Sequence, residues 1–430
     1  MPRGQRTACV GRSSLRATGN WHLVTANAPY APPMVVPPDR PPSPERPPRW
    51  IAVAAVLGFA IVLIGIGMFG QSTTVATSST TEPLLLDVDD PVSSTGVAVD
   101  VPPPAGEIPG LSGRVVVVTG IGESDGYYRQ VWLRVWDAGS GMMITSDLER
   151  SAFGFAVDPA GEHLAFRAAD GAVWIQDLAA PSGEVVIAGG VGSLAWSPDG
   201  SRLAVVEGNP SAEGWALAAY SYEEGALGRR EEITTMGAGG LLLGWNDAGL
   251  WVAQGMNQPG ARVAVYGDDG VVVADVPGAW AWVGPGERAV VYSPGDQNPV
   301  RVVDLTSTGD GFRVPSGSGL FAWPTDVADT RLAETGIDEG ASEAGWLQVW
   351  DTATGELLHK YDLAAPYGVS WDWSDRFVVM PAHRGVGRVY FYDTVDGSLH
   401  DLSFGEEIVW FAAVVPPSTT LNPTPPAVQN

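Results

Sequence analysis

The stretch Ser193 to Val206, SLAWSPDGSRLAVV, decides the fold class of this chain. It contains an apolar segment that ends in an aromatic residue, then a turn made of Pro, Asp and Gly, and then a second apolar run. Pro and Asp favour the dihedral angles of tight turns, and Gly permits a positive φ. The stretch therefore predicts two antiparallel strands joined by a short turn.

The same pattern recurs along the chain at intervals of about 37 to 50 residues, the period expected of propeller blades. Because each copy supplies two adjacent strands, we interpret the copies as the first two strands of successive blades. The other copies are GFAVDPAGEHLAF around Phe155, LLLGWNDAGLWVA at Trp245, AWAWVGPGERAVVY at Trp282, LFAWPTDVADTRLA at Trp323 and VSWDWSDRFVVM at Trp371, with EEIVWFAAVV at Trp410 as a seventh candidate.

A second repeated element is a hairpin, and it also occurs seven times. In most copies an Asp closes the first strand and a Gly supplies the flexibility of the turn. The copies are VWLRVWDAGSGMMI, VWIQDLAAPSGEVV, LAAYSYEEGALGRR, RVAVYGDDGVVVADV, VRVVDLTSTGDGFRV, LQVWDTATGELLHKY and RVYFYDTVDGSLHDL. These hairpins are expected to form the third and fourth strands of the blades.

The two sets of repeats are offset by one at the chain ends. The first hairpin has VVVVTG before it but no aromatic strand, and the last aromatic strand, at Trp410, has no hairpin after it. Placing the C-terminal strand beside the three N-terminal strands completes one blade and removes an exposed edge. We therefore predict an all-β, seven-bladed β-propeller at residues 113–414, with six or eight blades as alternatives.

Three of these phrases resemble WD-repeat propellers and the bacterial WD-like propellers of the periplasm: VWDTATGELL, LRVWDAGSG and SLAWSPDGSRLAVV. The resemblance extends over about 300 residues, which corresponds to seven blades of the usual repeat length. The Gly-His dipeptide that opens many WD repeats is absent. The resemblance implies a rigid interaction platform, usually without catalytic activity of its own.

A hydrophobic segment precedes the repeats. Residues Trp50 to Gly70 include nineteen consecutive residues without a charge, IAVAAVLGFAIVLIGIGMF. Some 20 such residues span the roughly 30 Å hydrocarbon core of a bilayer as one α-helix. We predict a transmembrane anchor at 50–70, between a disordered Arg/Pro-rich tail at 1–49 and a Ser/Thr/Pro-rich linker at 71–112. Residues 415–430 are expected to form a second disordered tail.

The flanks of this segment predict its orientation. Arg40, Arg46 and Arg49 precede it, and no charge follows until Glu82. The positive-inside rule then places the N-terminus in the cytoplasm and the propeller outside, in a single-pass protein of the cell membrane. A cleaved signal peptide, with a poor site at Thr74 to Ala76, is the alternative. A start of translation at Met34 is a further hypothesis.

Charge and cysteine content exclude several classes of protein. Residues 71–430 contain 17 basic and 47 acidic groups, a net charge of −30 obtained by subtraction. Such a field repels nucleic acid and favours cationic partners. Cys9 is the only cysteine, so the chain has no intramolecular disulfide and no cysteine metal cluster. We expect no nucleic-acid partner, and another protein or a cell-envelope ligand instead.

Motifs of catalysis are not evident in the sequence. The five histidines show no metal-ligand spacing, and no G-x-S-x-G elbow or P-loop is present. Asp247 to Trp251 approaches a sialidase-type Asp box but is one residue short. We therefore expect no enzymatic activity, no metal and no cofactor. A propeller-type carbohydrate hydrolase or lyase is the alternative function, and acidic pairs leave calcium as an alternative ligand.

The connections between the second and third strands of the blades are the longest and lie on one face of a propeller, where function is commonly located. Their charged residues are mostly acidic, so we predict that this face binds a basic or calcium-bridged partner. The simpler interpretation is that these loops share the acidic composition of the whole domain. The candidates are Glu123, Asp125, Glu207, Glu213, Asp296, Asp338, Glu339, Glu343, Arg384 and Arg388.

The recurrent tryptophans allow two interpretations. A ring of aromatic residues could bind a sugar, but recurrence at one position of each blade favours packing between blades. We expect the second role for Trp196, Trp245, Trp282, Trp323, Trp371 and Trp410.

Overall fold

A computed structural model provides the structure of this protein. Every residue that the structure describes lies within Leu57–Asn430. The structure describes residues 104, 106–122, 128–148, 152–168, 171–179, 183–187, 191–208, 215–223, 225–237, 240–256, 260–294, 300–307, 311–315, 319–337, 344–364, 366, 368–382, 387–405 and 407–417.

The predicted anchor at 50–70 lies outside this description, as do the tail before it, most of the linker and residues 418–430. Among the residues that are described, no helix has the length and apolar character needed to cross a bilayer. The anchor and its orientation therefore stay predictions.

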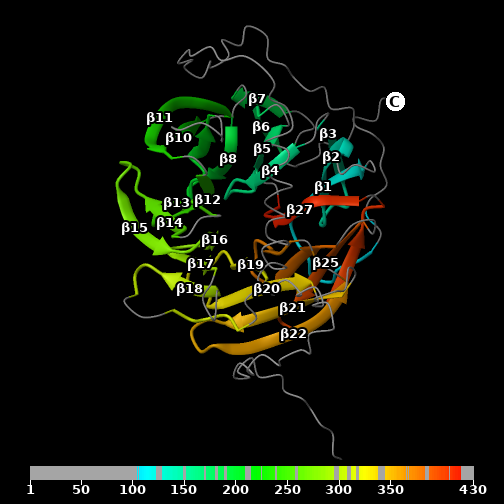
Figure 1. The fold of residues 1–430 in the computed structure, drawn as a ribbon. Helices are drawn as coiled ribbons and strands as arrows, with labels where there is room; N and C mark the ends of the chain where they lie inside the picture. Colours follow the sequence, from blue (N-terminus) through cyan, green and yellow to red (C-terminus); the bar gives the residue numbers. More distant parts are fainter. Residues whose placement is uncertain are drawn as a thin grey trace, which may run out of the picture. The chain divides into compact units, whose positions relative to one another are not determined.

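The described part of the chain is all-β, and its strands form seven sheets arranged as the blades of a β-propeller (Figure 1). Blade 1 contains β27 (Glu407–Val415), β1 (Arg114–Gly122), β2 (Tyr128–Asp137) and β3 (Met143–Asp147). Blade 2 contains β4 (Ala152–Val157), β5 (His163–Ala168), β6 (Val173–Asp177) and β7 (Gly183–Ile187). Blade 3 contains β8 (Val191–Trp196), β9 (Arg202–Glu207), β10 (Trp215–Glu223) and β11 (Ala226–Met236).

The other four blades continue in chain order. Blade 4 contains β12 (Leu241–Asn246), β13 (Gly249–Gln254), β14 (Arg262–Tyr266) and β15 (Val272–Pro277). Blade 5 contains β16 (Trp280–Val283), β17 (Arg288–Tyr292) and β18 (Val300–Asp304). Blade 6 contains β19 (Leu320–Ala322), β20 (Arg331–Ile337), β21 (Ala344–Asp351) and β22 (Glu356–Ala364). Blade 7 contains β23 (Ser370–Trp371), β24 (Phe377–Pro381), β25 (Arg388–Asp393) and β26 (Leu399–Ser403).

The predicted closure of the ring is confirmed. β27 pairs antiparallel with β1, from Arg114 opposite Val415 to Gly120 opposite Glu407, so the C-terminal strand completes the blade begun by the N-terminal ones (Figure 1). A parallel bridge between Asp372 and Val414 also joins β27 to blade 7. The first and last described strands are thus held within one sheet, and the edges of β1 and β27 that face each other are hydrogen-bonded.

Blade 5 departs from the four-stranded pattern. The sequence predicts a hairpin at Val300 to Val314, and β18 is its first strand. The backbone N–H of Val302 donates to the carbonyl of Phe312, and that of Val314 donates to the carbonyl of Val300. These bonds and the bridge between Arg301 and Arg313 place a short extended segment where the other blades have a fourth strand.

The hydrophobic core is divided among the blade junctions. Within the described residues there are seven clusters of buried apolar side chains, and each one joins two adjacent blades. Trp196, Trp323 and Trp371 are buried members of these clusters, and Trp245 and Trp282 pack against them. This confirms the packing role expected of these five tryptophans, while the side chain of Trp410 lies outside the description.

A segment before β1 also packs on the propeller. Ile108, in the part of the chain assigned to the linker from sequence, is buried in the cluster that joins blade 7 to blade 1. Gly113 has a φ of +96°, and a Cβ there would lie 2.7 Å from the indole nitrogen of Trp373. Only glycine allows the chain to pass this close to Trp373 before entering β1.

Candidate functional site

The antiparallel blades give the propeller two different ends. Turns between the first and second strands and between the third and fourth strands lie at one end, which we call the turn face. Connections between the second and third strands lie at the opposite end, which we call the loop face. The sequence placed the binding site on the loop face.

Most of the predicted loop-face residues lie outside the described part of the chain. These are Glu123, Asp125, Glu213, Asp296, Asp338, Glu339, Glu343 and Arg384. The structure therefore describes two of the ten candidates, Glu207 and Arg388, and the acidic loop face stays a prediction.

Glu207 lies at the end of β9 and is buried, with 8% of its surface exposed. The guanidinium of Arg230 donates to its carboxylate at 2.7 Å, and the hydroxyl of Tyr220 donates to the other oxygen. Burial, and then the adjacent carboxylate, raise the pKa of Tyr220 well above its ordinary value, so the hydroxyl remains a donor. These bonds tie together the three outer strands of blade 3.

Arg388 begins β25 and is exposed. Its guanidinium lies 3.5 Å from the carboxylate of Asp401 on β26, and both side chains are close to half exposed. A pair of this kind contributes little to stability because water screens it. Arg388 is therefore accessible to a partner at the loop-face end of blade 7.

The first strands of the blades line the middle of the propeller, and they are almost free of charge. Among β4, β8, β12, β16, β19, β23 and β27, the only ionisable residue is Glu407. Their hydrophilic side chains connect neighbouring blades instead. The hydroxyl of Ser193 accepts from the N–H of Leu242, and the hydroxyl of Ser370 donates to the carbonyl of Ala412. The amide of Asn246 donates to the carbonyl of Gly284 at 3.0 Å.

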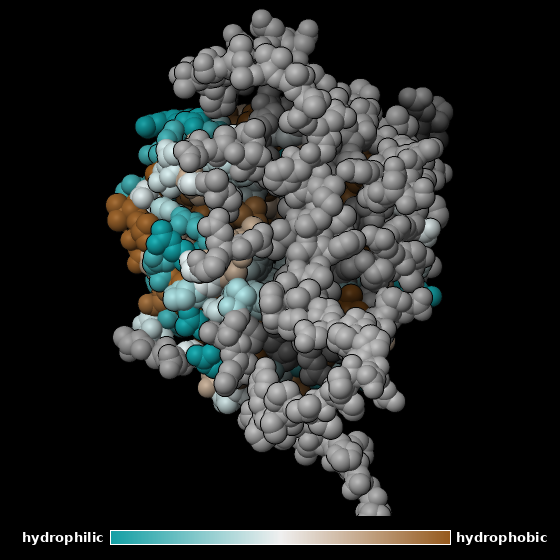
Figure 2. Space-filling view, viewed as in Figure 1, coloured by the Kyte–Doolittle hydropathy of each residue, from teal (hydrophilic) through white to brown (hydrophobic). Residues whose placement is uncertain are grey.

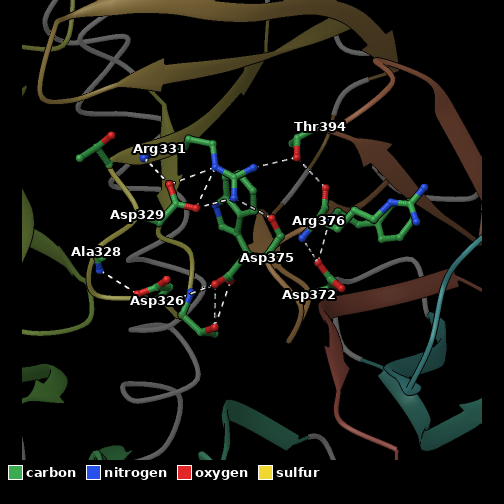
Figure 3. Close-up of polar contacts among 12 residues, drawn as sticks. Asp326, Ala328, Asp329, Arg331, Asp372, Asp375, Arg376 and Thr394 are labelled. Atoms are coloured by element: carbon green, nitrogen blue, oxygen red, sulfur yellow. Dashed lines mark hydrogen bonds and ion pairs between the residues drawn. The ribbon is translucent and has the colours of Figure 1, made fainter.

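The turn face contains a dense polar network at the junction of blades 6 and 7 (Figure 3). Its centre is Asp375, in the turn between β23 and β24. One carboxylate oxygen accepts the N–H of Thr325 at 2.7 Å, and the other accepts the N–H of Asp326 at 2.9 Å. Among the described residues, Asp375 is the only non-glycine residue with a positive φ, +56°. This conformation costs free energy and persists because the surrounding bonds fix it.

Arg331 connects three elements of this network (Figure 3). Its guanidinium pairs with Asp329 and donates to the hydroxyl of Thr394 and to the carbonyl of Asp375, both at 2.8 Å. It also lies 4.7 Å above the ring of Trp371. Burial acts to raise the pKa of Asp329, but the bonds from Arg331 outweigh it and hold that pKa below its ordinary value. The ion pair therefore persists at neutral pH.

The Arg331 arrangement recurs between other blades. Arg202 lies 4.6 Å above the ring of Trp245, and Arg288 lies 4.8 Å above that of Trp323. In each case an arginine before or at the start of a blade's second strand covers the tryptophan of the next blade, a favourable cation–π contact. Sequence reasoning missed these pairs, although the signal was present in the arginine that follows each turn, as in GSRLAVV and GERAVVY.

Three apolar side chains project from the interlocked turns. They are Val327, which is 56% exposed, Trp373, which is 37% exposed, and Val395, which is 78% exposed. Val327 belongs to the turn before β20, Trp373 to the turn before β24, and Val395 to the turn between β25 and β26. We call these three residues the turn-face patch. None of the three was among the predicted binding residues, because those residues were chosen from the long connections and these turns are short.

A second exposed apolar surface lies on the outer strand of blade 4. Val271, Val272 and Val273 are 58%, 48% and 58% exposed, and Figure 2 shows brown surface at the outer left edge, where β15 lies in Figure 1. The register of β15 against β14 shifts between Val265 and Tyr266. Such a bulge leaves one residue unpaired and re-aims its neighbours, which explains how successive valines are all exposed.

The described residues contain no group of three or more His, Cys, Asp or Glu side chains that could hold a metal ion. The acids of the turn face are separated by the bonds they make to backbone N–H groups and arginines. Calcium binding at the loop face, most of whose acids lie outside the described residues, stays a prediction.

Fold and site together define this chain as a seven-bladed β-propeller whose described first strands contain one ionisable residue and whose described turn face contains a polar network. No protein-family model matches the sequence, and no curated protein matches it. Among solved structures it is similar to TolB from Acinetobacter baumannii, with 14% identity, a TM-score of 0.44, and coverage of 71% of this chain and 67% of that one.

Two further structures show comparable similarity. The β-propeller domain of the Trilobed protease from Pyrococcus furiosus has 15% identity and a TM-score of 0.47, with coverage of 70% of this chain and 96% of that one. The acylaminoacyl peptidase of Pyrococcus horikoshii has 15% identity and a TM-score of 0.46. The match covers 65% of this chain and 49% of the peptidase.

Proposed function

We propose that this chain is a membrane-tethered, extracytoplasmic β-propeller that serves as a scaffold for binding another protein or a cell-envelope ligand. The observation that carries the proposal is the composition of the first strands, in which Glu407 is the only ionisable residue. A propeller enzyme commonly needs acids and bases that converge where the blades meet. Here the hydrophilic groups at that place connect one blade to the next, so the rims are left for recognition.

The alternative, a propeller-type carbohydrate hydrolase or lyase, requires different chemistry. Glycoside hydrolysis uses a pair of carboxyl groups about 5 to 10 Å apart, one of them with a raised pKa. Lone Glu407 cannot form such a pair among the first strands. The binding proposal is therefore better supported than the catalytic one.

Tethering is supported by the apolar segment at 50–70 and by the arginines before it. The native cysteine offers a direct test, because Cys9 is the only cysteine and precedes the anchor. In intact cells, a membrane-impermeant maleimide is expected to leave Cys9 unlabelled and to label it after permeabilisation. A Cys9→Ser, Val395→Cys variant is expected to show the opposite, labelling in intact cells, since Val395 is 78% exposed. Labelling of Cys9 in intact cells contradicts the proposed orientation.

The loop face is proposed as one binding surface of the scaffold. Neutralising its seven acids other than Glu207 to Asn or Gln is expected to reduce recovery of cationic envelope partners at least tenfold in a pull-down with the full chain. Charge complementarity accelerates association, so the loss should shrink as salt is raised. Glu207 is left intact because its carboxylate binds Arg230 and Tyr220 inside blade 3.

A matched control changes the same number of acids at exposed positions away from the loop face. Retention of partners by this control and their loss from the loop variant is the expected result. Equal recovery with both variants excludes the loop face, and the absence of any partner with the wild-type chain contradicts the scaffold. The control substitutions are at Glu107, Glu162, Glu223, Glu231, Asp247, Asp269 and Glu356.

A further inference from the structure

The turn-face patch is presented on a rigid base. The turn that carries Val327 is bound to the turn that carries Trp373, because the carboxylate of Asp375 accepts two N–H groups from the neighbouring turn. Arg331 links both of them to Thr394, the residue before Val395. A surface that is already ordered loses little conformational entropy when a partner binds, which favours affinity.

The three side chains of the patch are apolar and exposed. Two valines and a tryptophan are exposed on adjoining turns, although apolar side chains gain free energy by leaving water. The indole nitrogen of Trp373 donates to the carbonyl of Ser112 at 3.0 Å, which fixes the ring while leaving part of it accessible. Tryptophan is enriched among residues that dominate binding energy.

The charges around the patch are one-sided. Asp326 and Asp396 are exposed, and the hydroxyl and N–H of Ser398 hold the pKa of Asp396 below its ordinary value, so it is ionised at neutral pH. Each of the two neighbouring arginines is paired with an acid, and their side chains are 27% and 36% exposed. Arg331 binds Asp329, and Arg376 binds Asp393 at 2.9 Å and lies over the ring of Phe377. A partner at this surface therefore meets apolar groups within a negative rim.

We propose that the turn-face patch of Val327, Trp373 and Val395 docks a protein segment in which apolar side chains are flanked by Arg or Lys. The inference rests on the proposed scaffold function and adds a surface at the end of the propeller opposite the loop face. A second copy of this chain fits the patch poorly, because two negative rims would face each other and repel. A scaffold with recognition surfaces at both ends can hold two partners at once.

The test is a selection of peptides against the purified full chain in detergent. A phage-displayed library of random twelve-residue peptides is panned on the wild-type chain, and the enriched peptides are synthesised and their affinities measured. The expected consensus contains large apolar residues flanked by Arg or Lys. A Val327→Ser, Trp373→Ser, Val395→Ser variant is expected to bind these peptides at least tenfold more weakly, with affinities that fall as salt rises.

The matched control is Val271→Ser, Val272→Ser, Val273→Ser, which changes exposed apolar residues of β15 instead. It is expected to retain wild-type affinity. The single variant Val395→Ser removes the most exposed member of the patch and is expected to fold normally, so a loss of binding there cannot be assigned to unfolding. It should weaken binding about threefold.

Several outcomes overturn the inference. They are the absence of enriched peptides, an acidic consensus, equal affinity for the patch variant and the wild-type chain, or a loss confined to the β15 control. Wild-type dimers in sedimentation experiments that dissociate in the patch variant also overturn it, in favour of a second copy as the occupant. If partners are still lost from the loop-face variant in the pull-down, the scaffold stands and only the turn-face proposal fails.

Discussion

Removal of residues 406–430 is expected to prevent the propeller from folding. The deleted strand, β27, buries Ile408, Val414 and Val415 at the junctions of blade 1 with blades 7 and 2. Full burial of such side chains contributes about 2 kcal/mol each, which together approaches the whole stability of about 5–15 kcal/mol of a typical domain. The deletion also exposes the edge of β1. We expect the truncated chain to lose its cooperative thermal transition and to be digested by protease under conditions in which the wild-type chain resists.

The control for this prediction removes residues 418–430 only, leaving β27 complete. That chain is expected to unfold at the wild-type temperature. A truncated chain without β27 that still shows a sharp transition near the wild-type midpoint would mean that blade 1 is stable with three strands. If β27 can pair with β1 as a separate chain, a peptide comprising residues 407–417 is expected to restore the protease resistance of the truncated chain.

Arg331→Ala is expected to lower the free energy of unfolding by about 3 kcal/mol. The substitution removes bonds to three elements and leaves the carboxylate of Asp329, whose side chain is 15% exposed, without its cation. It also removes the contact with the ring of Trp371. Urea unfolding of the full chain, followed by tryptophan fluorescence, measures the change.

Two further variants isolate the cause. Arg262→Ala removes an ion pair whose side chains are 55% and 46% exposed, and it is expected to cost no more than about 0.5 kcal/mol. The double variant Arg331→Ala, Asp329→Ala is expected to recover about 1 kcal/mol relative to Arg331→Ala, since it no longer contains an uncompensated carboxylate. An effect of Arg331→Ala equal to that of Arg262→Ala would show that the network contributes nothing beyond a surface ion pair.

The architecture was largely predictable from sequence because each blade repeats the same local signals. Strand pairs joined by turns such as Ser197 to Ser201 depend on residues close in sequence, and the structure confirms that turn through the N–H of Gly200 donating to the carbonyl of Ser197. The missing partner of the first hairpin correctly predicted the position of β27. In blade 5 the sequence predicted a full hairpin at Val300 to Val314, but only its first strand, β18, forms, and the second half is a short extended segment.

The candidate site was less predictable. The weight given to long connections selected the loop face, and eight of those ten residues lie outside the part of the chain that the structure describes. Glu207 was chosen as an exposed loop acid, but it is buried beside Arg230 and Tyr220. Glu207 is buried because Tyr220 on β10 and Arg230 on β11 pack against it. The residues next to Glu207 in the sequence do not reveal how these strands pack against β9.

From sequence alone one could predict the all-β class, a ring of seven blades with six or eight as alternatives, closure by the C-terminal strand and the packing role of the recurrent tryptophans. These features follow from turn residues, strand alternation and repeats. All three patterns can be read from a single sequence without knowledge of tertiary contacts. The tertiary structure was needed to show that arginines cover the tryptophans of neighbouring blades, that Asp375 binds the turn of blade 6, and that Val327, Trp373 and Val395 are exposed in turns at the same end of the propeller. The contacts of these arginines and of Asp375 join residues about 35 to 50 positions apart, and their geometry arises only when packed blades bring separate turns together.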